Sequence, residues 1–190
     1  DVTGWAPERI SRQGLGRSYQ KTNIFLPLTV HENVRLAAQS RDAQQPWNPL
    51  RWWQDTRANT IKNSATNARL ESAIELSGLK DRRMAIAGAM SHGEQRQLEI
   101  AMTLATEPQV LLLDEPLAGM GVAEAERMVE LLQRLKPAHA IMLVEHDMDA
   151  VFALADRLTV MVNGEVIAHG IPPEVRADAT VQAAYLGEDH

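Results

Sequence analysis

Val110-Leu111-Leu112-Leu113-Asp114-Glu115-Pro116 is the stretch of sequence from which the rest of the chain can be read. Four consecutive apolar residues are typical of a strand buried on both faces of a parallel sheet. Ligands of such sheets gather beyond the carboxyl ends of the strands, where Asp114 and Glu115 would stand. An Asp after a strand often does no more than cap the next element. Two adjacent acids followed by Pro favour a stronger interpretation: Asp114 holds Mg²⁺ and Glu115 accepts a proton from an attacking water.

The composition is that of an ordinary globular protein of 190 residues, 45% hydrophobic and 23% charged. This length suffices for one domain, or for a core with a small subdomain. The net charge of −6 disfavours nucleic acid as a partner. Because the sequence has no cysteine, disulfides, thiolate metal sites and a cysteine nucleophile are excluded. No apolar run approaches the roughly 18 residues that cross a bilayer, so work at a membrane would require a partner.

Periodicity and turn signals predict alternating helices and strands along the C-terminal half. Asn163-Gly164 predicts a tight hairpin, and Thr29 with Glu32 predicts a capping box. The sequence therefore predicts an α/β fold with a mostly parallel sheet and a mainly helical middle. Expected helices cover residues 7–10, 67–77, 91–106, 122–135, 148–155 and 172–186, with another starting at residue 30; expected strands cover 110–113, 140–145, 158–162 and 165–169, with another ending at residue 20.

Residues 40–62 have the least regular pattern and contain Trp47, Trp52 and Trp53. We expect a loop with a short helix here. The tryptophans could form an aromatic box for a ligand, but packing of the loop onto the body or a partner is the more common role.

Ser91-His92-Gly93-Glu94-Gln95 begins a predicted helix. Ser91 and Glu94 have the spacing of a capping box, which is a purely structural role. That role does not account for Gly93, because Gly within a helix costs about 1 kcal/mol relative to Ala. A Gly in the first turn lets a phosphate approach the backbone N–H groups at the positive end of the helix dipole. The motif therefore has a structural and a phosphate-binding interpretation.

Two further polar residues follow predicted strands. His146 comes directly after the strand at 140–145, where a phosphate ligand is expected, although a lone His there is more often structural. Gln20 ends the first predicted strand and could orient a water or contact Mg²⁺. Neither residue is informative by itself.

Taken in order, these motifs resemble those of the ATP-binding subunits of ABC transporters, and the resemblance covers the whole chain. It implies a catalytic Glu115, and an Asp114 and Gln20 that hold the Mg²⁺ of ATP. His92 departs from the Gly most common at its position. The resemblance assigns the Q-loop to Gln20, the signature to Ser91, His92, Gly93, Glu94 and Gln95, Walker B to Val110–Asp114, the D-loop to residues 117–120 and the H-loop to His146.

The resemblance also implies an architecture and partners. Residues 1–23 and 107–190 would form part of a P-loop NTPase core, and residues 24–106 an inserted helical subdomain. Two such subunits, identical or different, would sandwich two ATP molecules head to tail. Ser91 and Gly93 of one subunit would then meet the γ-phosphate held by the other. Residues 23–33 would contact membrane-spanning permease subunits at the cytoplasmic face of the cell membrane, and a periplasmic solute-binding protein would take part indirectly.

Finer features resemble the ATPases of branched-chain amino acid importers, with urea importers as the nearest alternative. These features are residues 117–121, Glu145-His146-Asp147-Met148 and Tyr185-Leu186-Gly187-Glu188. A non-catalytic docking module is a second alternative from another functional class. The short helical insert, without a coiled coil or basic arm, argues against an ABC ATPase of DNA repair or translation.

The family's P-loop, Gly-x-x-x-x-Gly-Lys-Ser/Thr, has no counterpart in the sequence, because none of its four lysines follows a Gly. In the family the P-loop precedes the segment equivalent to residues 1–4, so we expect an N-terminal part to be missing here. The 190 residues alone are then expected to bind MgATP weakly and to be inactive. Micromolar MgATP affinity in a calorimetric titration would refute this expectation.

Overall fold

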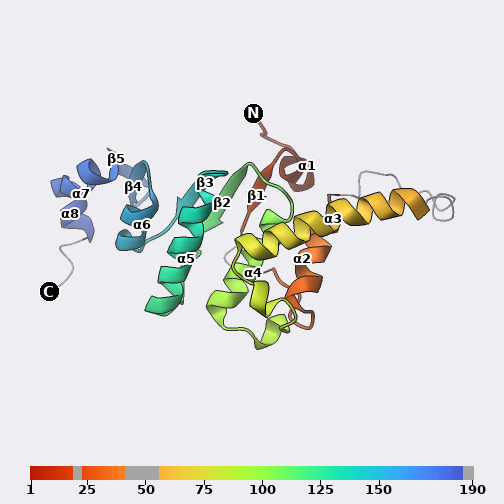
Figure 1. Ribbon diagram of the computed structural model, residues 1–190. Helices are drawn as coiled ribbons and strands as arrows, with labels where there is room; N and C mark the ends of the chain where they lie inside the picture. Colours follow the sequence, from red (N-terminus) through yellow and green to blue (C-terminus); the bar gives the residue numbers. More distant parts are fainter. Residues whose placement is uncertain (19–22, 42–55, 186–190) are drawn as a thin grey trace. The chain divides into compact units, whose positions relative to one another are not determined.

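The computed structural model describes residues 1–18, 23–41 and 56–185, and divides the chain into two compact units, Asp1–Glu145 and His146–His190 (Figure 1). The first unit combines helices with a parallel sheet, and the second combines helices with a hairpin. The α/β prediction is therefore confirmed. The predicted division into a core and a helical subdomain at residues 24–106 stays a prediction.

The sheet of the first unit has three parallel strands in the order β1 (Leu15–Arg17), β2 (Val110–Asp114) and β3 (Ala140–Val144). In the register of β2 and β3, Asp114 lies beside Val144. Residues that follow these two strands therefore emerge at the same edge of the sheet. This is the edge at which the sequence places Asp114 and Glu115.

β2, which was predicted to be buried on both faces, is fully buried on only one of them, and β3 is half-buried at best. Leu111 and Leu113 are buried, but Met142 and Val144 are 62% and 51% exposed. Alternate side chains of a strand point to opposite faces of the sheet. Among the described residues, packing buries only one of those faces. A run of apolar residues shows which strand can be buried, but not which elements cover it.

The helices of the first unit follow the predicted order. α1 begins with Pro7, as expected, and α5 has the predicted bounds. α3 begins at Thr56 rather than at residue 67, because its first turns lack the apolar period used to find it. The three tryptophans of segment 40–62 lie outside the described residues. The bounds are α1 Pro7–Arg12, α2 Val30–Gln39, α3 Thr56–Leu76, α4 His92–Leu104 and α5 Val122–Leu135, with short 3-10 helices at Lys80–Arg82 and Ala87–Ala89.

α2, α3 and α4 pack together around an aliphatic core (Figure 1). Val34 on α2, Ile74 on α3 and Leu98 on α4 are almost completely buried. Gly78 follows α3 with a φ of +75°, the left-handed conformation expected of a helix terminator. The apolar residues that recur at helical spacing on these three helices therefore face one another.

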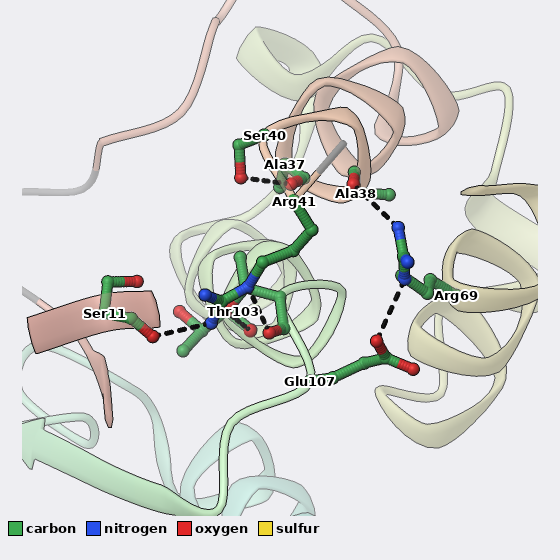
Figure 2. Close-up of polar contacts among 9 residues, drawn as sticks. Ser11, Ala37, Ala38, Ser40, Arg41, Arg69, Thr103 and Glu107 are labelled. Atoms are coloured by element: carbon green, nitrogen blue, oxygen red, sulfur yellow. Dashed lines mark hydrogen bonds and ion pairs between the residues drawn. The ribbon is translucent and has the colours of Figure 1, made fainter. Parts of the chain in front are cut away.

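Two arginines join the C-terminal ends of the helices (Figure 2). Arg41, just after α2, donates to the carbonyl oxygens of Ser11 and Thr106 at 2.8 and 2.6 Å. Arg69 donates to the Glu107 carboxylate at 2.9 Å. Burial lowers the pKa of Arg41, although the carbonyl ends of helices favour a cation. These contacts tie α1, α2 and α4 into one unit.

The second unit contains the predicted hairpin. β4 and β5 pair antiparallel, and Asn163 and Gly164 both have positive φ, as a type I′ turn requires.

The tail is two helices rather than one, because the backbone of Asp178 is extended and its carboxylate accepts the N–H of Thr180. The bounds are α6 Met148–Leu154, β4 Leu158–Val162, β5 Glu165–Gly170, α7 Pro172–Ala177 and α8 Ala179–Tyr185. Among the described residues, no helix combines the length and apolarity needed to cross a bilayer.

Candidate functional site

The acidic pair lies where β2 ends. Asp114 and Glu115 are both half-buried, and Glu115 has a φ of +46°. A non-glycine residue in this left-handed conformation costs on the order of 1–2 kcal/mol. The backbone holds it with two bonds, since the Glu115 N–H donates to Val144 O at 2.9 Å and its carbonyl accepts from Ala118. The strained turn ends the strand and begins the loop 117–120.

Glu145 fixes the start of that loop. Its carboxylate accepts the backbone N–H of Leu117 at 2.8 Å. Glu145 follows β3 as Glu115 follows β2, so two carboxylates leave the same edge of the sheet. The sequence places Glu145 beside a predicted functional residue, but no local pattern predicts its bond to a residue 28 positions away.

Ser18 joins β1 to the same edge. Its side chain is buried, its N–H donates to Leu112 O at 2.9 Å, and its hydroxyl accepts the Asp114 N–H at 3.4 Å. Gln20 lies two positions further along the chain and outside the described residues. Its predicted place beside the acidic pair therefore stays a prediction.

The start of α4, residues 91–95, is called the α4 tip below. The capping box is confirmed: the Ser91 N–H donates to the Glu94 carboxylate at 3.0 Å, and the Glu94 N–H donates to the Ser91 hydroxyl at 3.3 Å. Glu94 also pairs with Arg82 at 2.8 Å. Gln95 donates to the carbonyl oxygens of Ala87 and Met90. These contacts fix the N-terminal end of the helix and leave the serine hydroxyl proton for another acceptor.

His92 connects the α4 tip to the loop that follows the acidic pair. Its Nε2 lies 3.2 Å from Ala118 O. Gly119, with a φ of +73°, lies next to the His92 ring. The residue at which the sequence departs from the most common family pattern therefore makes a specific contact. Through it the structure brings the α4 tip and the loop after Asp114 and Glu115 together.

Glu124, in the first turn of α5, is a residue that the sequence analysis missed. The Ser91 hydroxyl donates to its carboxylate at 2.7 Å. A Cβ at Gly93 would lie only 2.9 Å from a Glu124 side-chain atom. A side chain at position 93 would therefore force Glu124 to shift, and the group that lies against Gly93 in this structure is a carboxylate.

His146 is the first residue of the second unit. It follows Glu145 directly in the chain, but its predicted place in the site with Glu115 remains a prediction. The convergence of Gln20, Glu115 and His146 is thus untested, whereas Asp114, Glu115 and the α4 tip are linked through residues 117–120.

The residues present fit a nucleotide-bound magnesium ion. Mg²⁺ in phosphotransfer sites takes one or two carboxylates, with phosphate oxygens and water completing its shell. Asp114 is a half-buried carboxylate at the carboxyl end of a parallel strand, which meets that requirement. Among the described residues, no group of three or more acids and histidines is arranged to hold a metal by itself.

An apolar surface lies on the helical side of the first unit. Phe25, Leu26, Met84 and Ile86 are between 45% and 71% exposed. Backbone bonds join their two segments, since the Gly88 N–H donates to Leu26 O at 2.9 Å and Thr29 forms a β-bridge with Ile86. Met84 and Ile86 were not predicted as functional, because nothing in the sequence near them indicates that they remain exposed.

Comparison with known families identifies the chain. The ABC transporter model matches residues 2–118. The chain belongs to the ABC transporter ATP-binding family. Residues 165–190 match a second model, described as branched-chain amino acid ATP-binding cassette transporter. One match therefore lies in each compact unit.

Curated relatives agree with this assignment. The high-affinity branched-chain amino acid transport ATP-binding protein LivG of Salmonella typhimurium is 34% identical over 98% of this chain and 73% of its own length. BraF of Pseudomonas aeruginosa, with the same description, is 33% identical over 99% of this chain and 73% of its own length. The lipopolysaccharide export protein LptB of Escherichia coli is 32% identical over 94% of this chain and 68% of its own.

Solved structures show the same fold. An ATP-binding cassette of an ABC transporter, MJ1267, is 26% identical, with a TM-score of 0.75 over 97% of this chain and 73% of its own. CbiO1 of Clostridium perfringens is 25% identical, with a TM-score of 0.71 over 94% of this chain and 65% of its own. The chain thus spans about two thirds to three quarters of the proteins it matches. Its fold is that of the ABC ATPases, a family of transport-coupled ATP hydrolases.

Proposed function

We propose that this chain is the ATP-binding and ATP-hydrolysing subunit of an importer for branched-chain amino acids. The observation that carries the proposal is the contact of the α4 tip with the loop that follows Asp114 and Glu115. This contact supports the proposal because it links the acidic pair to the N-terminal end of a helix, where the helix dipole favours an anion. The C-terminal match at residues 165–190 favours branched-chain amino acids over urea as the solute.

Within the site, Asp114 and Gln20 would hold the Mg²⁺ of ATP, which would supply positive charge against the charge that develops on the phosphates. Glu115 accepts the proton of the attacking water, because it is half-buried, rigidly held and next to the metal ligand. His146 is proposed, on the family resemblance, as a contact of the γ-phosphate. ATP with Mg²⁺ is the cofactor that these roles require.

A second ATP-binding subunit completes each site. Ser91 and Gly93 reach the γ-phosphate held by that subunit, while His92, Glu94 and Gln95 build and orient the α4 tip. The N-terminal end of α4 offers N–H donors and the positive end of the helix dipole to the phosphate. The partner is a second copy of this chain or a related cassette.

The apolar surface of Phe25, Leu26, Met84 and Ile86 is the docking site for a membrane-spanning permease subunit. Exposed apolar patches of this kind mark protein interfaces. The subunit then works peripherally on the cytoplasmic face of the cell membrane, and a periplasmic solute-binding protein acts through the permease. Met84→Glu should abolish co-purification with the permease; retention of the permease would exclude this surface.

A non-catalytic docking module is the second candidate, favoured for these 190 residues alone by the lack of a P-loop motif. We propose that the 190 residues alone bind MgATP weakly, which a calorimetric titration tests. The two candidates differ in what they predict for the assembled transporter: turnover for an ATPase and none for a docking module.

The deciding experiment measures ATP hydrolysis by the assembled transporter with Glu115→Gln in this subunit. Loss of a general base should reduce turnover by roughly 10²- to 10⁴-fold while nucleotide binding persists. Glu126→Gln is the matched control, since it removes the same charge from an exposed position on α5. Unchanged turnover in the Glu115 variant would refute the assigned role, and absence of ATPase activity in the parent would favour the docking module.

A further inference from the structure

The hydroxyl of Ser91 has one proton, and it donates this proton in a hydrogen bond to the Glu124 carboxylate. The Ser91 Oγ to Glu124 Oε1 distance is 2.7 Å, which is short enough for a strong charge-assisted bond. The same hydroxyl oxygen already accepts the Glu94 N–H within the capping box. Ser91 therefore cannot donate to a phosphate oxygen while this contact persists.

Glu124 also occupies the space above Gly93. Atoms of its side chain lie 2.9 to 3.1 Å from the place where a Cβ of Gly93 would be. Gly93 is buried in this structure, although it stands in the first turn of an otherwise accessible helix end. The open side of the glycine, which a phosphate would need, is thus covered by a carboxylate.

The positive potential at the N-terminal ends of α4 and α5 explains why a carboxylate lies against Ser91 and Gly93. Glu124 lies in the first turn of α5 and contacts the first turn of α4, so it is close to the positive ends of two helix dipoles. The nearby Glu94 carboxylate is occupied by the Ser91 N–H and by Arg82. Glu124 supplies the negative charge that a phosphate would supply in its place.

A place for the displaced side chain is present. A cavity of about 410 Å³ adjoins Ser91, and Arg127 lines it. Arg127 stands three positions after Glu124 on α5, the spacing at which helix side chains meet. A carboxylate that leaves Ser91 therefore has a cation within reach on its own helix.

We propose that Glu124 is a positioning residue that masks the α4 tip, and that the γ-phosphate of ATP must displace it from Ser91 before the two subunits close. The proposal rests on the proposed function, because it takes Ser91 and Gly93 as the phosphate contacts. Glu124 sets the nucleotide concentration at which the subunits associate. It keeps the tip from binding other anions when ATP is absent.

The test measures the ATP concentration that half-saturates association of the full-length subunit, using light scattering and the Glu115→Gln background to prevent hydrolysis. Glu124→Gln should lower that concentration about fivefold, because a neutral acceptor holds Ser91 roughly half as strongly as a charged one. Glu124→Asp retains the charge but is one methylene too short to reach Ser91, and should give most of the same gain. Glu126→Gln, on the same helix, should give none.

Each outcome has a distinct meaning. An unchanged or raised half-saturating ATP concentration in Glu124→Gln would refute the proposal that Glu124 masks the α4 tip. If Glu124→Asp has the same half-saturating ATP concentration as the parent, the proposal is also wrong, because Glu124 would then act only through its long-range charge. If the parent subunits do not associate with one another in the presence of ATP, the proposed function is wrong, and the proposed role of Glu124 is wrong with it.

Discussion

α2 and α4 begin with the same capping motif but use its hydroxyl differently. At α2, the Thr29 hydroxyl bonds the Glu32 carboxylate of its own box at 2.8 Å. At α4, the Ser91 hydroxyl bonds Glu124, a residue 33 positions away, at 2.7 Å. The second position of the helix also differs, being His31 in α2 and Gly93 in α4. One box is therefore closed on itself, whereas the other leaves its hydroxyl to bond outside the box, beside a glycine, as the proposed phosphate-facing role of α4 requires.

The largest difference between the two boxes should appear in turnover. Ser91→Ala removes the proposed donor to the γ-phosphate, and we expect the ATPase rate of the assembled transporter to fall by roughly 10²-fold, as when a single transition-state donor is lost. Thr29→Ala is the matched variant, and because Thr29 lies within residues 23–33, which we expect near the permease, its rate is measured per assembled transporter and should equal the parental rate. Equal rates for the two variants would remove the functional distinction between α2 and α4.

Stability should show a smaller contrast than turnover. Loss of an N-cap hydroxyl costs about 1 kcal/mol, so both alanine variants should unfold at lower urea concentration. The two variants should lose similar amounts of stability, because each hydroxyl accepts one backbone N–H and donates to one carboxylate. Urea unfolding followed by circular dichroism measures both. A Ser91 variant far less stable than the Thr29 variant would indicate that its loss of turnover is structural.

The smallest effect concerns pH. Bonds from the Thr29 N–H and hydroxyl lower the pKa of Glu32 below its ordinary value of 4.5. A lowered carboxyl pKa contributes stability above the unfolded-state pKa and loses it as the pH falls through the folded-state pKa. The difference in urea midpoint between the parent and Glu32→Gln should therefore be constant near neutral pH and shrink below about 4.5. A difference that persists undiminished at lower pH would contradict the closed box at α2.

Local patterns in the sequence predicted much of the fold correctly. Both capping boxes, the Asn163-Gly164 hairpin and the bounds of α5 depend on residues within one turn or one helix, and the structure confirms them. The start of α3 was missed because its first turns carry no apolar period. The break at Asp178 was missed because an Asp within an amphipathic pattern is ambiguous until its carboxylate is seen to cap α8.

Contacts between distant residues could not be predicted in the same way. Glu124 meets Ser91 and Glu145 meets Leu117 only because the sheet and α5 bring separate segments together. The exposure of Met142 depends on what covers a sheet face, which an apolar run does not specify. Family resemblance supplied roles for Gln20 and His146 that the structure leaves as predictions. The site was therefore predictable as a set of motifs, but not as a network of contacts.

The central claim is that the α4 tip acts on nucleotide held by another subunit. Mixing full-length subunits that carry Ser91→Ala with subunits that carry Glu115→Gln tests it most directly, because a head-to-tail pair then contains one site with both defects and one intact site. The account predicts that the mixture hydrolyses ATP well above the sum of the two separate variants. Turnover no higher than that sum would show that Ser91 and Glu115 do not serve sites shared between subunits, and would contradict the account.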